Sequence, residues 1–120
     1  MQGKTHQQME FIENFDGVVI ACDTEGTIIY INDKAATNYQ KEGGRSLIGK
    51  NLKDCHKDSS SEKIKQMMEK HEKNVYTIEK NGKKKIIYQS PWFHNGVCGG
   101  LVEFSLEIPF DMPHFIRDNS

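Results

Sequence analysis

A tight turn in the C-terminal half constrains the fold of this chain more than any other feature. The dipeptide Asn81-Gly82 separates two strand-like stretches, 75–80 and 83–93. Asn-Gly suits a type I′ turn, because both central residues of that turn need positive φ and its twist matches that of paired strands. These residues therefore predict an antiparallel β-hairpin.

Two further segments predict strands. The β-branched runs 18–22 and 27–31 flank Asp23-Thr24-Glu25-Gly26, whose glycine can adopt the positive φ of a turn. A last strand follows the turn at 94–96, and it alternates apolar with mixed side chains. We expect the apolar set to form its buried face. The apolar set is Val102, Phe104, Leu106 and Ile108, and the mixed set is Leu101, Glu103, Ser105 and Glu107.

Helix signals lie before and between these strands. Met9, Phe11, Ile12 and Phe15 predict a short N-terminal helix. Asn32 and Asp33 offer N-cap side chains for a helix over 34–39, where Ala35, Ala36 and Tyr39 share an apolar side. Three glycines interrupt 40–58, so short turns are expected there. Ser59 and Glu62 match a capping box, and a helical stripe follows at Ile64, Met67, Met68 and His71.

The order of these elements predicts an α+β fold, with a five-stranded antiparallel sheet and helices on one face. A chain of 120 residues is the usual size of one domain. We expect an N-terminal helical cap at 1–15, the domain proper at 16–108 and a C-terminal tail at 109–120. Such a shell can enclose a small cavity or be filled by its own side chains, and both readings stay open.

The charge and cysteine content exclude several classes of partner. The formal net charge is -1, so no global field attracts nucleic acid or an anionic membrane. The basic run Lys83-Lys84-Lys85 falls at a hairpin tip without interleaved aromatic residues, which favours a solvated turn. There is no long apolar segment and no secretory signal, and the three cysteines lack CxxC spacing. These features predict a cytoplasmic protein with reduced thiols.

Three sequence signatures resemble the PAS (Per-Arnt-Sim) family of sensory domains, over about 15–108. The first is Gly17-Val18-Val19-Ile20-Ala21-Cys22-Asp23 followed by Gly26, Ile28, Tyr30 and Asn32; the second is Leu47-Ile48-Gly49-Lys50-Asn51-Leu52; the third joins Gly82 to Gly99-Gly100-Leu101-Val102-Glu103. The resemblance implies strand order 2-1-5-4-3, a ligand cavity between the sheet and the middle helices, and dimers often made through the N-terminal helix. We expect a homodimer that uses this helix and the sheet face.

The second signature also resembles the flavin-binding photosensor subgroup. The photoreactive cysteine of that subgroup corresponds to Leu52 here, which disfavours cysteine-adduct photochemistry. The string Asp54-Cys55-His56 is similar to a subset of PAS domains whose ligand we cannot name. Haem and flavin are possible cofactors for this fold, but no residue pattern in the sequence supports either one, so the cofactor is left unknown.

Candidate pocket residues follow from the apolar stripe, the middle segment and the late strands. They are Tyr39, Leu47, Ile48, Leu52, Cys55, His56, Ile64, Met67, Met68, His71, Tyr88, Ser90, Trp92 and Phe104. His71 and His56 are weak candidates for a metal or haem ligand, and a helix-end role is favoured for His71. Cys55 could serve redox sensing if nearby lysines lowered its thiol pKa, but adjacent Cys55 and His56 do not easily chelate one ion.

The sequence favours a sensor over an enzyme. No Ser/His/Asp arrangement, P-loop or dinucleotide fingerprint is present, so we name no catalytic residues. The first hypothesis is a sensory and signal-transduction module that binds a small ligand or cofactor and relays the event to an effector protein or output domain; a role in regulating transcription follows by family analogy alone. The alternative is a ligand-free dimerisation domain.

Overall fold

One antiparallel sheet organises the molecule. The computed structural model describes residues 9–52 and 58–118, with the backbone alone at 58–61. The five strands are arranged in the order β2-β1-β5-β4-β3. Their bounds are β1 Val18–Asp23, β2 Ile28–Ile31, β3 Asn74–Lys80, β4 Lys83–His94 and β5 Val97–Ile108. The predicted α+β fold and strand order are thus confirmed.

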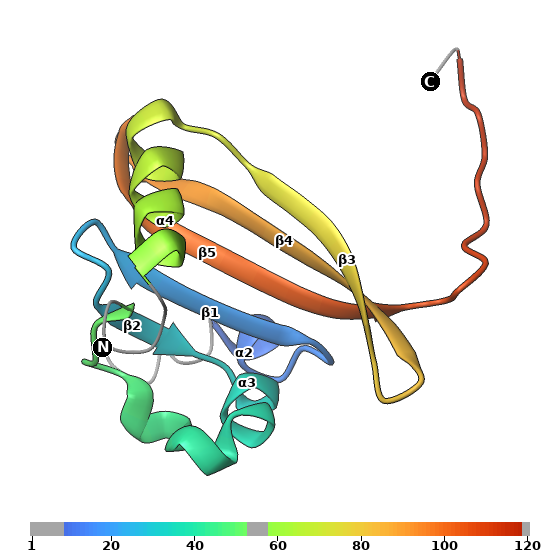
Figure 1. Ribbon diagram of the computed structural model, residues 1–120, viewed down its shortest axis with the longest axis horizontal. Helices are drawn as coiled ribbons and strands as arrows, with labels where there is room; N and C mark the ends of the chain where they lie inside the picture. The colour runs from blue at the N-terminus through green and yellow to red at the C-terminus, as the bar shows by residue number, and fades with distance from the viewer. Residues whose placement is uncertain (1–8, 53–57, 119–120) are drawn as a thin grey trace.

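The helices are short except for one. They are α2 Glu10–Glu13, α3 Asp33–Asn38, the 3-10 turns η1 Gln40–Glu42 and η2 Gly44–Leu47, and α4 Asp58–Lys70. Figure 1 shows α4 crossing the sheet in front of β5, while α3 and the 3-10 turns follow β2 along one border. Residues 109–118 run away from the domain as an extended tail. No helix of the described part is long and apolar enough to span a bilayer.

Both late turns have the backbone that their sequences predict. Asn81 and Gly82 have φ of 54° and 76°, as a type I′ turn requires. Asn95 and Gly96 repeat this pattern with 51° and 80°. The strands on either side pair without interruption from Lys80 with Lys83 to Asn74 with Gln89. The predicted hairpin is therefore confirmed.

The helix boundaries differ from prediction at α4. This helix begins at Asp58, so Ser59 lies inside it and not at its N-cap, and the predicted capping box is wrong. At the other end the helix stops at Lys70. His71 has φ 55°, and the amide of Glu72 donates to the carbonyl of Met67 at 3.0 Å. These features describe a Schellman C-cap, which places His71 beyond the helical stripe.

The apolar core consists of two buried clusters. Val18, Ile28, Ile31, Ala35 and Leu47 form the first, between the β1–β2 hairpin and α3. Cys22, Met67 and Leu101 form the second, where α4 packs on the sheet. Leu52 packs against both clusters. The space that separates the two clusters is the candidate site.

The buried face of β5 is the reverse of the one predicted. Leu101 is buried and faces α4, whereas Val102, Phe104, Leu106 and Ile108 are only half-buried on the outer face of the sheet. The outer set is the more apolar one, but burial is decided by where the helices pack. Hydrophobic alternation identifies a strand and its two faces; it does not identify which face the helices cover.

Candidate functional site

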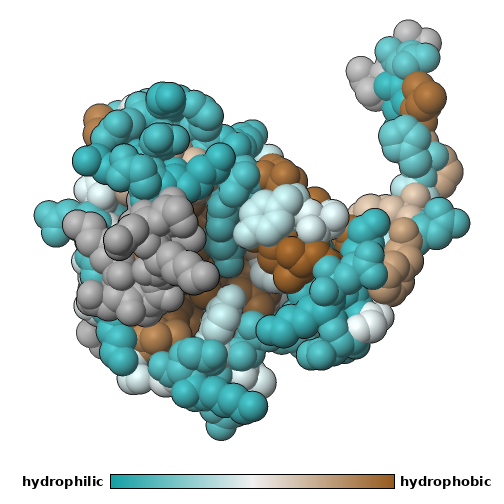
Figure 2. Space-filling view, viewed as in Figure 1, coloured by the Kyte–Doolittle hydropathy of each residue, from teal (hydrophilic) through white to brown (hydrophobic). Residues whose placement is uncertain are grey.

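A cavity of about 680 Å³ lies between the sheet, α4 and the segment from α3 to Leu52. Figure 2 shows hydrophobic side chains at the surface in the middle of this side of the molecule, near α4 and the β3–β4 hairpin. Apolar side chains form most of the lining. The lining residues are Ile20, Cys22, Ile28, Tyr39, Glu42, Leu47, Leu52, Lys63, Ile64, Asn74, Tyr76, Ile78, Ile87, Gln89, Leu101 and Glu103.

Strand pairing explains which sheet residues reach the cavity. Gln89 stands opposite both Asn74 and Glu103 in the ladder, and Glu103 stands opposite Ile20. Directly paired residues of neighbouring strands project to the same face, so these side chains form one row across the sheet. Ile87 and Leu101 project to this face as well.

The polar members of that row are joined by hydrogen bonds. The Nδ2 of Asn74 donates to the Oε1 of Gln89 at 2.9 Å. The Nε2 of Gln89 in turn donates to the Oε1 of Glu103 at 2.6 Å. A short hydrogen bond onto an ionised oxygen is of the stronger, charge-assisted kind. The floor of the cavity therefore carries one ordered polar row among apolar side chains.

Two tyrosines face this row. Burial raises the pKa of Tyr39, and the negative charge of Glu103 raises it further. Burial likewise raises the pKa of Tyr76, again with a contribution from Glu103. Both phenols therefore remain protonated at neutral pH and retain an O–H that can donate. Tyr39, Tyr76 and Glu103 all line the same cavity.

Four of the predicted pocket residues line the cavity, namely Tyr39, Leu47, Leu52 and Ile64. Met67 is buried beneath it against Cys22 and Leu101, and Met68 packs at the border of the same cluster. Ile48 is nearly half exposed and does not reach the cavity. Leu52 lines the cavity. It stands where the flavin-binding photosensor subgroup, which the second signature resembles, has its photoreactive cysteine, so this position offers no thiol.

Four other predictions are wrong, because Tyr88, Ser90, Trp92 and Phe104 lie on the outer face of the sheet. Tyr88 pairs with Phe104 and Ser90 with Val102, one residue out of phase with the row that lines the cavity. The Nε1 of Trp92 donates to the backbone carbonyl of Cys22 at 3.0 Å. A Cβ on Gly99 would meet its ring at 2.2 Å, so this indole has a structural role.

Sequence reasoning missed Gln89, Glu103 and the surrounding apolar residues of the sheet. One signal could have found them: Gln89 directly follows the apolar run Ile86-Ile87-Tyr88, and Glu103 stands between Val102 and Phe104. A charged residue there is costly to bury unless it has partners, and it commonly marks a functional cavity.

Of the histidine and cysteine candidates, only His71 belongs to the described residues, and it does not line the cavity. The ring of His71 packs edge-on against Phe93, with 5.0 Å between centroids. Cys55 and His56 lie outside the described residues. Within 9–52 and 58–118, no three His, Cys, Asp or Glu side chains are grouped as a metal would need.

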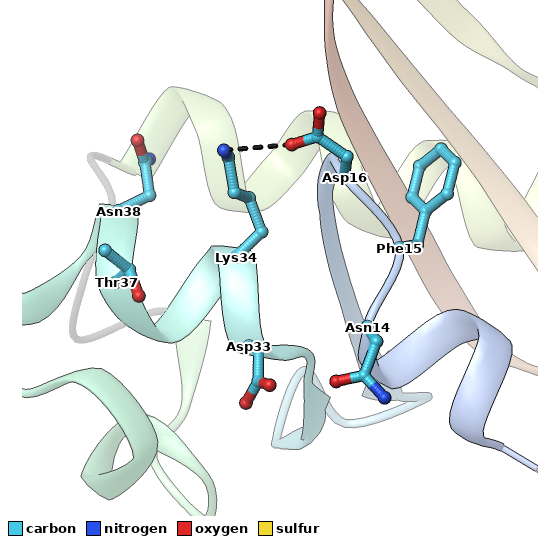
Figure 3. A pocket seen from close by; sticks show the side chains of 7 residues that line it. All are labelled: Asn14, Phe15, Asp16, Asp33, Lys34, Thr37 and Asn38. Carbon is cyan, nitrogen blue, oxygen red and sulfur yellow. Dashed lines mark ion pairs between the residues drawn. The ribbon is translucent and has the colours of Figure 1, made fainter.

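A second, open depression of about 380 Å³ lies between α3 and the linker before β1. Figure 3 shows Lys34 reaching from α3 to Asp16, with 3.0 Å between the charged atoms. Both side chains are more than half exposed, and such pairs contribute little to stability or binding. Phe15 is the one apolar side chain in the described lining of this depression.

Comparison with known proteins agrees with the fold. A family model described as PAS domain matches residues 16–97. No curated protein sequence matches the chain. A C-terminal domain from Streptococcus mutans has a similar structure, with a TM-score of 0.69 and 17% identity over 86% of this chain and 84% of that one.

Two similar structures come from Vibrio cholerae receptors. The Aer2 receptor, described as a dual PAS-heme oxygen sensor, has a TM-score of 0.61 and 17% identity over 82% of this chain and 99% of that one. The VqmA dimer has a TM-score of 0.65 and 13% identity, covering 87% of this chain but only 52% of that one. These identities show a shared fold. With the family model matching most of the domain, the chain belongs to the PAS domain family.

Proposed function

We propose that this PAS domain is a sensory module that binds a small organic ligand in the cavity between the sheet and α4. The observation that carries the proposal is the 680 Å³ cavity with its single polar row. Sites for small molecules commonly measure about 300–1,000 Å³ and combine apolar walls with a few well-placed polar groups. A relay to an effector protein or output domain completes the proposed role.

Similar structures support ligand sensing as a use of this fold. One VqmA structure is described as bound to DPO, and another is discussed in terms of DNA binding by receptors. A regulatory role in transcription is our proposal by analogy with that protein. The nature of the ligand must come from the residues of this chain.

The described lining fits an organic ligand better than haem. It contains no histidine, so the described residues offer no imidazole to a haem iron. It also offers no nucleophile at Leu52 for a flavin adduct. Cys22 is a poor nucleophile, because burial raises its pKa.

Native mass spectrometry of the protein purified without denaturation tests this proposal. We expect a bound small molecule that is released on acid denaturation, together with an absorption spectrum free of haem or flavin bands. A mass equal to that of the bare chain, combined with no thermal stabilisation by any member of a metabolite library, would show that the domain does not bind ligands.

A second candidate function is dimerisation through the outer face of the sheet. Five neighbouring apolar side chains are only half-buried there: Ile86, Tyr88, Val102, Phe104 and Leu106. An apolar patch on a sheet commonly marks a protein interface. This function is compatible with ligand binding, since the two use opposite faces.

We expect the wild-type protein to be a dimer and Phe104→Glu to be a monomer in size-exclusion chromatography with light scattering. The substitution adds a charge to the apolar patch. Thr37→Glu, which adds the same charge to an exposed position of α3, should remain dimeric. A wild-type monomer throughout the micromolar range, or a dimer that tolerates Phe104→Glu, would contradict this assignment.

A further inference from the structure

The hydrogen bonds of the polar row all run in one donor-to-acceptor direction, and the last acceptor is Glu103. Asn74 donates to Gln89, and Gln89 donates to Glu103. The side-chain amides of Asn74 and Gln89 therefore each donate one N–H to the next member of the row. The terminal member is a carboxylate, which only accepts hydrogen bonds when ionised. The row thus presents an acceptor to the cavity.

Glu103 has capacity left for a further partner. A carboxylate has two oxygens with about four lone-pair positions, and the hydrogen bond from Gln89 uses one position on Oε1. Among the ion pairs formed by the described residues, none involves Glu103. Its negative charge therefore faces the cavity, and no cation of the described residues lies within 4 Å of it.

The walls around this carboxylate are largely apolar. Leu101 lies on the same strand, Ile20 and Ile87 lie on the two neighbouring strands, and Tyr39 and Tyr76 line the same cavity. Electrostatic attraction is stronger in such surroundings than in water. A ligand cation beside Glu103 would gain a charge-assisted hydrogen bond and could also contact the tyrosine rings.

Charge complementarity argues against an anionic ligand. Among the described lining residues the charged side chains are Glu42, Glu103 and Lys63, which leave this part of the cavity with a net negative charge. An anion on the floor would meet Glu103 directly. A neutral ligand would leave the carboxylate without a compensating charge, which is costly in an apolar cavity.

We propose that the cavity recognises a small hydrophobic amine, whose protonated nitrogen binds Glu103 while its apolar body lies against Ile20, Ile87 and Leu101. This assignment rests on the proposed sensory function and adds the chemical class of its ligand. Tyr39 and Tyr76 then flank the ammonium group, and the Asn74–Gln89 pair holds the carboxylate in position.

Three probes of similar shape test the assignment by isothermal titration calorimetry: 2-phenylethylamine, 2-phenylethanol and 3-phenylpropionate. We expect the amine to bind at least about tenfold more tightly than the alcohol, because a hydrogen bond between charged groups contributes about 1.5–3 kcal/mol. The carboxylate should bind most weakly. This comparison uses the wild-type protein alone, so it does not depend on any variant folding.

Two matched variants locate the effect. Glu103→Gln keeps the shape and an acceptor for Gln89 but removes the charge, and it should reduce amine affinity about tenfold to the level of the alcohol. Glu107→Gln is the control: Glu107 lies on the same strand, is exposed beside Lys83 at 3.7 Å and does not line the cavity. Its amine affinity should stay within about twofold of wild type.

The outcomes separate this inference from the proposed function. Equal affinity for amine and alcohol, or unchanged amine affinity in Glu103→Gln, overturns amine recognition and leaves ligand binding in place. If none of the three probes binds but native mass spectrometry finds a different bound molecule, amine recognition is overturned and the proposed ligand binding stands. Failure of all probes together with an empty protein overturns both.

Discussion

At the scale of single residues, Asn32 connects three parts of the fold. It is fully buried. Its Oδ1 accepts from the amides of Val19 and Ala35, and its Nδ2 donates to the carbonyls of Ile12 and Gly17. The side chain thus caps α3 and ties it to β1 and to α2. All four hydrogen-bonding positions of the amide are used, so no other residue type can replace it without loss.

We expect Asn32→Ala to lower the free energy of unfolding by about 3 kcal/mol, since it removes a helix cap and leaves buried backbone groups without partners. Urea denaturation followed by circular dichroism measures the change. Thr37→Ala, at an exposed position in the same helix, should change it by less than about 0.5 kcal/mol. A loss below about 1 kcal/mol in Asn32→Ala would contradict this role.

Arg45 holds the N-terminal helix to the same region. Its guanidinium donates to both carboxylate oxygens of Glu13, to the carbonyl of Ile31 at 2.7 Å and to Asp33. The hydrogen bond and charge of Glu13 raise the pKa of Arg45, which therefore stays charged throughout the usual pH range. A planar guanidinium suits this arrangement, because it can serve several acceptors at once.

At the scale of elements, the β3–β4 hairpin supplies one wall of the cavity and two of the three members of its polar row, Asn74 and Gln89. Its register is determined by the Asn81-Gly82 turn, which aligns Asn74 with Gln89. A slip of one residue would turn Gln89 and Ile87 to the outer face. The turn therefore decides which side chains reach the cavity.

Gly82→Ala should lower the free energy of unfolding by about 1 kcal/mol. The φ of Gly82 is 76°, which is unfavourable for alanine, while its Cβ would meet nothing within 4 Å. The cost is therefore one of backbone conformation alone. Thermal unfolding measures it, and Lys80→Ala at the exposed strand end should be within about 0.5 kcal/mol of wild type. An unchanged stability in Gly82→Ala would show that another turn type replaces the observed one at no cost.

At the scale of the whole molecule, the two apolar clusters leave space between them. Leu52 bridges the clusters on one side, and the sheet closes the other. Well-packed proteins contain few voids of this size, because empty space forfeits dispersion contacts. The cavity is open to solvent on one side, where Tyr76 is 43% exposed, and a ligand that fills it would add the dispersion contacts that its walls lack.

The stability of variants with a larger side chain shows whether the cavity is open space or a packed core. Ile87→Phe, at a lining position, should leave the free energy of unfolding within about 1 kcal/mol of wild type and abolish ligand binding. Ile31→Phe, in the packed first cluster, should lower it by about 2 kcal/mol. Equal destabilisation by both variants would show that the cavity is filled in solution.

The sequence predicted much of the fold because its signals are local. The turn at Asn81-Gly82, the Asn32 cap and the β-branched runs each depend on neighbours in the chain, and they led to the strand order through the family resemblance. The site was predicted only in part. Tyr39, Leu47, Leu52 and Ile64 belong to the middle segment and helix whose apolar sides necessarily face the sheet.

Local signals in the chain were enough to predict the hairpins, the approximate positions of the helices and the family of this protein. Which face of β4 and β5 meets the cavity follows only from how the helices pack on the sheet. A strand alternates with a period of two whichever side is covered, and here both faces of β5 contain apolar residues. The packing of α4 against Leu101 selected the face that carries Gln89 and Glu103, and so it placed a carboxylate where hydrophobic patterning alone had placed Phe104.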